Sequence, residues 1–347
     1  MRRTPTLIRR RAARQPEQSR ATACTPPAKP YRRGGHAADT AIVLAALTDT
    51  RLAPIAALLF LSGVPAPHTD GAPVANAIEV VPVARAVQPG ELVVLTFTTP
   101  AGADRVSVSA FGREVPAVTI DENTWRALVG IDLNVAPGSY GVSIDVFAGE
   151  DVVSAAHTLD VASAHFETRH LRVDGAYVDP PAATRRRIAR DAAALAKAWK
   201  TTAEEPLWSG PFVRPVEGQV VSSFGKRSVL NGKPRSSHGG ADFRGATGTP
   251  VHAPNAGRVV LARDLYYTGH TVVIDHGLGL FSLFAHLSAI DSAEGDEVST
   301  GQLVGRVGAT GRVTGPHLHW AVRVGGARVD PLSLLAVLGA DSETFRR

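Results

Sequence analysis

The sequence predicts a mainly β protein in which two strand-rich regions are joined by one helix. Three observations support this fold class. The 347 residues include 33 Gly and 24 Pro but only 6% aromatic residues, a balance typical of many turns and short strands. Short β-branched runs bounded by turn residues recur on both sides of a single segment with helical periodicity. The hydrophobic fraction of 44% is that of a globular chain and excludes a disordered or collagen-like one.

Residues 1–77 have the pattern of a basic leader and a signal peptide. Residues 1–36 carry nine Arg, one Lys and one Glu, and two apolar runs follow at 41–47 and 52–61. Neither run reaches the roughly 18 residues that span a bilayer, and Asp49 and Arg51 separate them. A positive region, a short apolar region and the small residues Ala75–Ala77 together describe a secretory signal that leaves Ile78 as the mature start.

The leader predicts where the protein acts. We expect an exported chain in the periplasm or cell envelope, or outside the cell, with no stable membrane span after processing. Because Met1 is the only methionine, a translation start nearer Arg51 would need a non-Met start codon. The alternative is a disordered basic tail followed by a buried apolar segment.

Charge and cysteine content exclude several functions. Residues 78–347 hold 26 basic and 28 acidic residues, so the net charge of +5 resides in the leader. A chain with no excess positive charge in its folded part is not expected to bind nucleic acid. The single Cys24 also lies in the leader, which excludes disulfides, cysteine-ligated zinc and thiol catalysis from the rest.

Residues 78–162 are predicted to form a small β-domain. Its β-branched runs lie at 92–97, 106–109, 140–146 and 159–161, and Pro-Gly and Ala-Gly pairs separate them. This spacing predicts an immunoglobulin-like sandwich without the usual cysteine pair. No chemistry-bearing residues cluster there, so we expect a packing or targeting role.

Residues 163–206 are predicted to be a linker that contains a helix over 181–202. The predicted buried stripe consists of Ile188, Ala192, Leu195, Ala196 and Trp199. Pro180-Pro181 supplies a start and Glu205-Pro206 a stop. The stripe predicts packing on the next domain. The basic residues off the stripe are expected to be solvated, with contact to an anionic wall polymer or lipid surface as the alternative.

Residues 207–337 are predicted to form a second β-domain, followed by a tail at 338–347. Val-rich runs recur at 257–262, 271–275, 280–285, 303–307 and 318–324, with Gly-containing turns between them. No segment of helical length and periodicity lies between these runs. The pattern predicts a curled antiparallel sheet.

Histidine marks the chemistry of this second domain, which holds seven of the twelve histidines between His238 and His319. His238 precedes Asp242 by four residues, and His317 precedes His319 by two. Side chains repeat every two residues along a strand, so each pair is expected to share one face of its segment. Two His and one carboxylate on one face commonly hold Zn²⁺ with a fourth position open for water. Gly and Pro residues surround both pairs, and the glycines allow tight backbone and leave space beside the site for an extended substrate.

Residues 211–335 contain a series of short motifs around these histidines. They are Ser223-Phe-Gly-Lys-Arg227, Asn231-Gly-Lys-Pro-Arg235, His238-Gly-Gly-Ala-Asp242, Gly248-Thr-Pro-Val251, Ile274-Asp-His-Gly277, Phe284-Ala-His-Leu-Ser288, Gly301-Gln-Leu-Val-Gly305, Thr310-Gly-Arg-Val-Thr-Gly-Pro-His-Leu-His-Trp320 and Asp330-Pro331. In these motifs and their order, the region resembles the M23 family of zinc metallopeptidases, which have the lysostaphin-like (LytM) fold. The preceding β-domain and helix also resemble the N-terminal region of its bacterial murein endopeptidase branch.

The resemblance implies a role for five residues. His238, Asp242 and His319 would be the ligands of one zinc ion per chain, as their spacing also suggests. His286 and His317 would be the two catalytic histidines beside the zinc-activated water. Which of the two takes the proton and which stabilises the oxyanion is left open.

Other residues of the matching region are not ligands in this resemblance. His252 and His276 are expected to be structural. Phe284 stands where this branch often has Tyr, and His270 where it often has Asn. If that Tyr hydroxyl contacts substrate, the expected substitute donor is Tyr266 or Tyr267, with His270 as the third candidate. The alternative is that the two Tyr merely pack at the edge of the sheet.

The resemblance and the leader together imply an exported zinc endopeptidase that cuts the peptide cross-links of peptidoglycan. Its partner would be the peptide stems, with D-alanyl–diaminopimelate cross-links expected rather than glycine bridges. Two alternatives belong to other classes: a non-catalytic LytM-like activator of other wall hydrolases, and a secreted protease of proteins. An activator usually lacks one or more ligands, whereas this chain has all three. The oligomeric state is not predicted.

Overall fold

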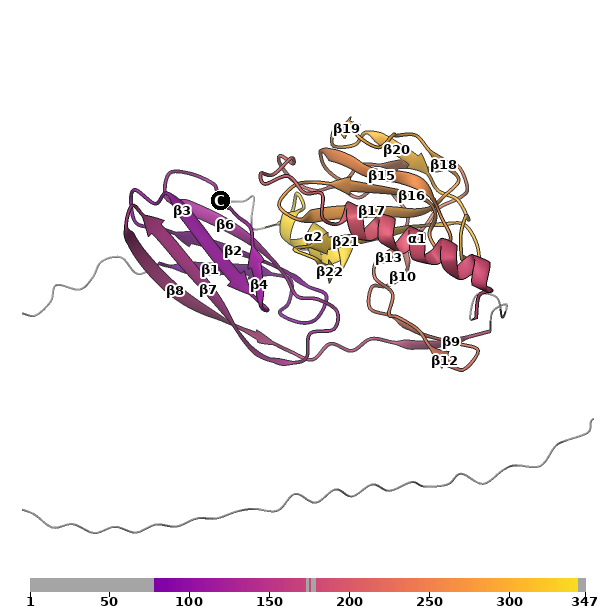
Figure 1. The fold of residues 1–347 in the computed structure, drawn as a ribbon, viewed down its shortest axis with the longest axis horizontal. Helices are drawn as coiled ribbons and strands as arrows, with labels where there is room; N and C mark the ends of the chain where they lie inside the picture. Colours follow the sequence, from indigo (N-terminus) through magenta and orange to yellow (C-terminus); the bar gives the residue numbers. More distant parts are fainter. Residues whose placement is uncertain (1–77, 173–174, 176–178, 343–347) are drawn as a thin grey trace, which may run out of the picture. The chain divides into compact units, whose positions relative to one another are not determined.

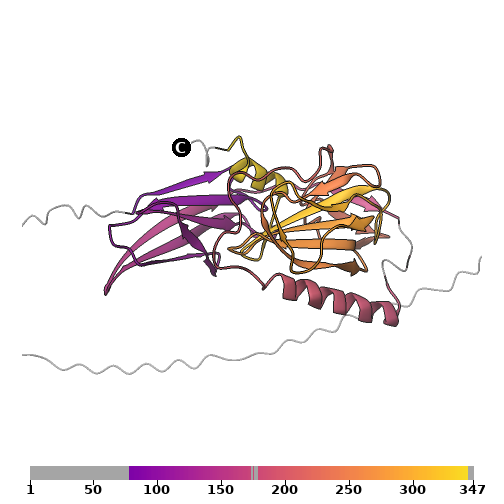
Figure 2. The ribbon, with the colours of Figure 1, turned by 90° about the horizontal axis from the view of Figure 1, so that it is seen from above.

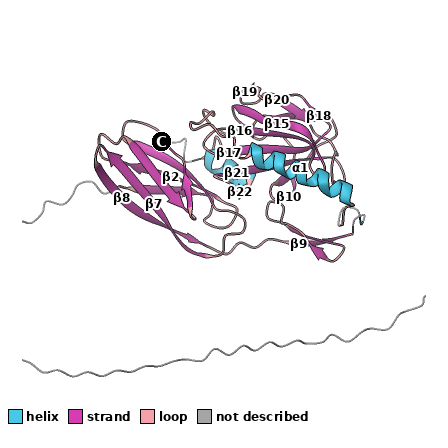
Figure 3. Ribbon diagram, in the orientation of Figure 1, coloured by secondary structure: helices cyan, strands magenta, loops and turns pink. Residues whose placement is uncertain are grey.

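A computed structural model describes residues 78–172, 175 and 179–342 (Figure 1). The prediction of a mainly β fold is confirmed, because strands dominate the described residues (Figure 3). The predicted leader, its apolar runs and its cleavage site lie outside the described residues, as do the last five residues of the predicted tail. No helix in the described part of the chain is both long and apolar enough to cross a membrane.

The first strands form two four-stranded antiparallel sheets, with the orders β1-β2-β6-β5 and β4-β3-β7-β8. Buried residues of both sheets share one hydrophobic cluster, as in a β-sandwich. The immunoglobulin-like topology stays a prediction. The strands are β1 (Val80–Ala84), β2 (Leu92–Thr98), β3 (Arg105–Ala110), β4 (Arg113–Val115), β5 (Ala117–Thr119), β6 (Thr124–Gly130), β7 (Gly138–Ala148) and β8 (Asp151–Val161).

Strand β2 is buried on both faces. Val93 and Leu95 point into the sandwich cluster, whereas Leu92 and Val94 belong to the core of the larger C-terminal sheet. The Leu92 N–H donates a hydrogen bond of 2.9 Å to the hydroxyl of Ser333 in the C-terminal region. This double burial explains why the run at 92–95 is continuously apolar rather than alternating.

The segment predicted as a linker contains a strand. Strand β9 (Thr168–Leu171) pairs in parallel with β11 (Arg227–Leu230), and β11 pairs with β12 (Lys233–Pro234) to complete a three-stranded sheet. The prediction of a helix alone in this segment was therefore incomplete. Strand β9 has only four residues, most of them polar, and is therefore too short and too polar to show a strand pattern in the sequence.

Helix α1 (Ala182–Ala198) confirms the predicted helix but ends four residues earlier than expected. Its packed face contains Ala194, Leu195, Ala198 and Trp199. The predicted Ala192 and Ala196 are exposed instead, so that part of the stripe was wrong. Alanine occurs on every face of this helix, and its spacing alone could not select the buried one.

The larger sheet has eight antiparallel strands in the order β10-β13-β21-β17-β16-β15-β19, with β22 paired to β21. A second, three-stranded sheet has the order β14-β20-β18. The strands are β10 (Val220–Ser222), β13 (Ala241–Arg244), β14 (Pro250–His252), β15 (Gly257–Leu265), β16 (Gly269–Asp275), β17 (Leu280–Leu287), β18 (Ala289–Ile290), β19 (Glu297–Val298), β20 (Leu303–Arg306), β21 (His317–Val324) and β22 (Ala327–Val329).

The chain then enters α2 (Pro331–Leu338), a short helix that the sequence did not predict. Asp330 caps it by accepting a hydrogen bond of 3.0 Å from the Leu332 N–H. The Phe212 N–H donates a 2.7 Å hydrogen bond to the Leu338 carbonyl. The helix thus ends one residue past the predicted end of the domain at 337 and includes the first residue of the predicted tail.

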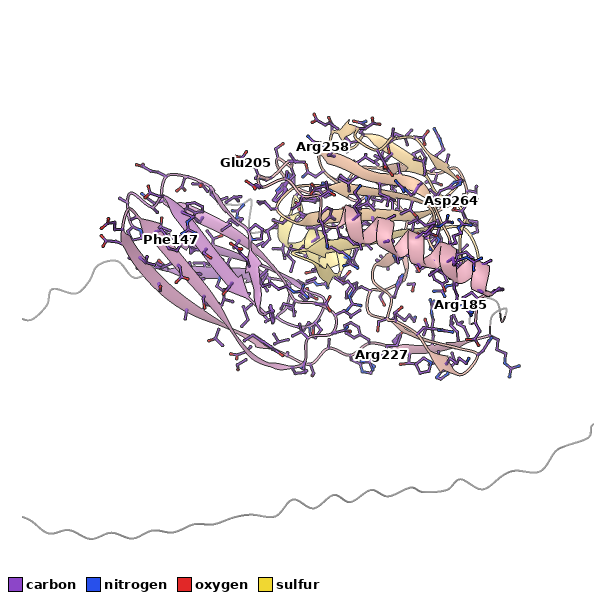
Figure 4. All side chains as sticks on the ribbon, viewed as in Figure 1. Phe147, Arg185, Glu205, Arg227, Arg258 and Asp264 are labelled. Carbon is purple, nitrogen blue, oxygen red and sulfur yellow. The ribbon has the colours of Figure 1, made fainter. Side chains whose placement is uncertain are left out.

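The two faces of the larger sheet bury different clusters. Along β21, Leu318, Trp320 and Val322 point into the main core, and the alternate residues face the other side. Helix α1 packs on that other side through a cluster from β15, β16 and β17 (Figures 1 and 2). In the N-terminal half of the helix, Arg187 forms an ion pair with Asp264 near the end of β15. Figure 4 labels Asp264 on this strand, and Arg185 on the helix. The sheet face that carries α1 is also the face on which His317 and His319 lie.

Candidate metal centre

Strand pairing brings Asp242 and His319 together. The two residues are direct cross-strand partners in the antiparallel pair of β13 and β21. Antiparallel partners project to the same face, and two-residue alternation places His317 on that face as well. The expectation that His317 and His319 share a face is thus confirmed.

His238 reaches the same point from a loop. It lies outside β13, so the expectation that His238 and Asp242 share one strand face was wrong. The loop is held by hydrogen bonds of 2.9 Å from His238 N–H to the Lys226 carbonyl and 2.8 Å from Gly225 N–H to the His238 carbonyl. A Cβ at Gly240 would lie 2.4 Å from the Trp320 carbonyl oxygen, so only glycine lets the loop approach β21 this closely.

Three ligand atoms converge in this arrangement. His238 Nε2 lies 3.0 Å from Asp242 Oδ1 and 2.9 Å from His319 Nδ1, and the latter two atoms lie 2.9 Å apart. Ligand atoms of a tetrahedral zinc ion at about 2.0–2.2 Å are themselves roughly 3–3.5 Å apart. The three side chains are 12–14% exposed, so solvent can reach the centre. Geometry and access both fit a zinc site with an open position.

The donor chemistry fits a cation too. The Nδ1 of His238 lies 2.9 Å from the Ser223 carbonyl oxygen, which can only accept, so that nitrogen carries the ring proton. The Nε2 therefore presents a lone pair toward a carboxylate oxygen and a second imidazole nitrogen. Such a converging set of lone pairs is what a bound cation would satisfy.

The electrostatics of the three residues are strongly coupled. Burial alone would raise the pKa of Asp242, but the close His238 and His319 imidazoles outweigh it and hold that pKa far below its usual range. Burial is the main cause that lowers the pKa of His319. A charged carboxylate beside an imidazole that resists protonation is the state in which both act as metal ligands.

A β-bulge places His286 beside this centre. Val272 pairs with Phe284, but the next pair is His270 with Leu287, so β17 has one residue more than β16. His286 lies in this bulge with φ 64°, a left-handed conformation that is uncommon for a residue with a side chain. Bulges turn a side chain away from the regular pleat, and this one brings the His286 ring centroid to 5.0 Å from that of His317.

Backbone carbonyls orient both rings. His286 Nδ1 lies 2.9 Å from the Thr310 carbonyl oxygen, and His317 Nδ1 lies 2.8 Å from the Gly315 carbonyl oxygen. Both Nδ1 atoms therefore donate, and both Nε2 atoms keep a lone pair. Burial, followed by the neighbouring His319, lowers the pKa of His286 to about 3, so this ring is neutral at pH 7.

The remaining histidines lie apart from the ligand triangle. His276 is fully buried, with Nδ1 donating to the Ala256 carbonyl at 2.8 Å and Nε2 lying 3.0 Å from the Ser282 hydroxyl. This contact set agrees with its expected structural role. His270 and His252 are partly exposed, and neither is part of the group that could hold a metal.

The position of Phe284 argues against the alternative in which a hydroxyl at this position contacts substrate. Phe284 is fully buried in the main core beside Trp320, on the sheet face opposite His319. A hydroxyl at this position would lie in an apolar cluster, because the bulge begins only after Phe284. Tyr266 and Tyr267 pack edge to face at 4.9 Å, in keeping with the packing alternative.

Sequence patterns did not reveal the groups that orient the rings. The carbonyls of Ser223, Thr310 and Gly315 act through the backbone, and every residue has a carbonyl. Thr310 and Gly315 do lie in the Gly-rich run before His317, which was the only available sign of their proximity.

Known proteins are similar to this part of the chain. The model of "Peptidase family M23" matches residues 236–331. A crystal structure from Pseudomonas aeruginosa, described as a peptidase M23, is 31% identical with a TM-score of 0.57. That similarity covers 72% of this chain and 96% of the other.

Two curated relatives are similar over shorter regions. The peptidoglycan DD-endopeptidase ShyA of Vibrio cholerae is 34% identical over 166 residues, which cover 48% of this chain and 34% of ShyA. The DD-carboxypeptidase/endopeptidase Mpg of Neisseria meningitidis is 43% identical over 97 residues, which cover 28% of this chain and 22% of Mpg. The chain thus spans about a third or less of the length of these relatives.

Proposed function

Because the chain belongs to peptidase family M23, we propose that it is an exported zinc endopeptidase that cuts the peptide cross-links of bacterial peptidoglycan. The observation that carries the proposal is the triangle of His238, Asp242 and His319 ligand atoms beside the oriented rings of His286 and His317. A non-catalytic activator would not need both the complete ligand set and two oriented imidazoles.

His238, Asp242 and His319 would hold one zinc ion per chain. Three protein ligands without thiolates are typical of a catalytic site that keeps one position open. When bound there, zinc supplies a water of lowered pKa and polarises the carbonyl of the bond to be cut. The Ser223 carbonyl fixes the His238 ring so that its Nε2 is the ligand atom.

His286 and His317 would move the proton and stabilise charge. One imidazole accepts the proton of the attacking water at Nε2 and passes it to the leaving amine. The other stabilises the oxyanion, for which its Nε2 must carry a proton and donate. The geometry fits either assignment, because both rings have Nδ1 committed to a backbone carbonyl.

The substrate and the location are inferred from the relatives and the leader. The names of ShyA and Mpg include endopeptidase activity, and ShyA is named for peptidoglycan and a DD bond. This supports D-alanyl–diaminopimelate cross-links as the substrate and the peptide stems as the partner. Peptidoglycan lies outside the cytoplasmic membrane, so an exported enzyme in the periplasm or cell envelope is the consistent location.

Two variants separate ligand from catalyst. His238→Ala removes one of three ligands, so it should lose both zinc and hydrolysis. His286→Ala leaves all three ligands, so it should keep zinc but lose turnover on the order of 10²–10⁴-fold. Zinc is measured by elemental analysis and hydrolysis with purified peptidoglycan, and a chelator should abolish hydrolysis by the unmodified protein. An unmodified protein that hydrolyses without any metal, or a His286→Ala protein that loses zinc as fully as His238→Ala, would contradict the assignment.

A further inference from the structure

We infer that Thr310 is a positioning residue for His286. Its hydroxyl bridges the two strands at the bulge in β17, and its carbonyl thereby holds the His286 ring in place. The inference rests on the proposed function, in which His286 takes part in proton transfer or oxyanion stabilisation. It concerns a residue that lies outside the ligand triangle.

The Thr310 hydroxyl joins the two strands where the bulge ends. It accepts a hydrogen bond of 2.9 Å from the His270 N–H of β16 and donates one of 2.7 Å to the Leu287 carbonyl of β17. His270 and Leu287 are the strand pair that follows the extra residue. The side chain of a separate loop thus bridges the strand pair next to the bulge.

Close backbone packing fixes where the Thr310 carbonyl lies. A Cβ on Gly269 would come within 2.2 Å of the Thr310 hydroxyl, and one on Gly311 would come within 2.4 Å of the Gly269 nitrogen. The Arg312 N–H donates a hydrogen bond of 2.9 Å to the Tyr267 carbonyl. The loop at 310–312 and the turn at 267–269 therefore lie directly against each other, and the Thr310 hydroxyl ties the loop to the strand pair that follows this turn.

His286 is fastened to both of these segments. Its N–H donates to the Thr268 carbonyl at 2.8 Å, and its ring Nδ1–H donates to the Thr310 carbonyl at 2.9 Å. The ring proton thus stays on Nδ1 only while the carbonyl stays in position. If the loop moved away from the turn, the ring would lose its acceptor and could rotate or change tautomer.

Removing only the hydroxyl tests this dependence. Thr310→Val is close in shape but leaves the His270 N–H and the Leu287 carbonyl without their partner. We expect kcat to fall roughly 10- to 100-fold, the loss that follows a small misplacement of a reacting group. KM and the zinc content should change little, because the ligands lie on β13, β21 and the loop at 238. Thr310→Ser keeps the hydroxyl and should restore most of kcat.

A matched control is Thr300→Val. The Thr300 hydroxyl donates a hydrogen bond of 2.9 Å to the Asn255 side chain, outside the network just described. Its loss should leave kcat and KM at the unmodified values. All four proteins are compared on a cross-linked muropeptide dimer, and zinc is measured in each.

Nitrogen NMR of the imidazole rings gives a readout that does not need activity. The His286 signals are identified by their absence in His286→Ala. In the zinc-loaded unmodified protein and in Thr310→Ser they should show a proton fixed on Nδ1, and in Thr310→Val a mixture of tautomers.

The possible outcomes distinguish the two proposals. An unmodified protein that leaves the dimer intact contradicts the proposed function, while the NMR comparison still tests the positioning role. Unchanged His286 signals in Thr310→Val overturn the inference. So do loss of zinc in Thr310→Val, or a Thr310→Ser protein that is as impaired as Thr310→Val.

Discussion

At the scale of single residues, backbone carbonyls set the chemistry of the metal centre. Three of its four imidazoles donate a ring Nδ1–H to a carbonyl at 2.8–2.9 Å, namely His238, His286 and His317. Each of these rings is left with a lone pair on Nε2. His319 is the exception, since its Nδ1 lies in the ligand triangle. The site is therefore preorganised by loops as well as by strands.

His276 predicts a pH dependence of stability. Complete burial is the main cause that lowers its pKa to about 4, although a hydrogen bond to the Ala256 carbonyl raises it. Below the usual pKa of about 6.5, His276 is protonated in the unfolded chain but stays neutral in the folded protein. The free energy of unfolding is therefore not reduced by His276 above pH 6.5. As the pH drops from 6.5 to about 4, this residue lowers it by about 3 kcal/mol.

The variant His276→Asn isolates this effect. It has no titrating ring and can still donate to the Ala256 carbonyl. We expect the free energy of unfolding, measured with urea on metal-free protein at pH 7.0 and 4.5, to fall less in the variant than in the unmodified protein. An equal fall in both proteins would show that His276 is not protonated on unfolding.

Part of this site could be predicted from the sequence. The His-x-His pair and the four-residue spacing of His238 and Asp242 identified side chains that the structure brings together. The position of His286 could not be derived from spacing, because it depends on a bulge in the register of β16 and β17. The position of Phe284 depends on the same bulge, since alternation before the bulge places it in the core.

At the scale of elements, α1 is the main cover of the sheet face that carries the metal centre. Trp199 packs edge to face on Phe281 of β17 at 5.4 Å, and the Arg323 guanidinium lies 4.8 Å from its ring centroid. The Asp191 carboxylate accepts a hydrogen bond of 2.7 Å from the Tyr266 N–H. The helix is thus joined to three separate parts of the sheet.

Trp199→Ala should loosen this helix. A buried Trp→Ala change typically destabilises by about 3–5 kcal/mol, and for the half-buried Trp199 we expect about 2 kcal/mol in urea unfolding. Amide exchange in 187–198 should accelerate while zinc is retained, because Trp199 contacts none of the ligands. Lys200→Ala, at the exposed neighbouring position, is the matched control. Unchanged exchange in Trp199→Ala would mean that its ring does not hold the helix.

The sequence predicted the strands of the larger sheet well and the connections less well. Val-rich runs correspond to β15, β16, β17 and β21 of this sheet, and to β20 of the three-stranded sheet, because these strands are buried. Strand β9 pairs through its backbone, and its mostly polar side chains give no periodic pattern. Helix α2 was missed because a short, mostly apolar segment next to a sheet resembles a strand in composition.

At the scale of the whole molecule, contacts join the sandwich to the C-terminal region. Arg328 forms two side-chain hydrogen bonds with Asp132, at 3.0 and 2.7 Å. Burial would raise the pKa of Asp132, but these bonds outweigh it and lower the pKa to about 2. The Arg85 guanidinium likewise contacts both Glu91 and Asp330. The sequence showed the separate strands of the sandwich but not these contacts, which depend on pairs of charges far apart in the chain.

Hydrolysis of purified peptidoglycan tests the central claim most directly. Zinc-loaded protein is incubated with sacculi, and the muropeptides are then separated and identified. We expect cross-linked dimers to decrease and monomers to increase in step, with no change when a chelator is present or when His286→Ala is used. Dimers that persist with zinc-loaded protein, or products cut in the glycan strand rather than in the peptide cross-link, would contradict the account.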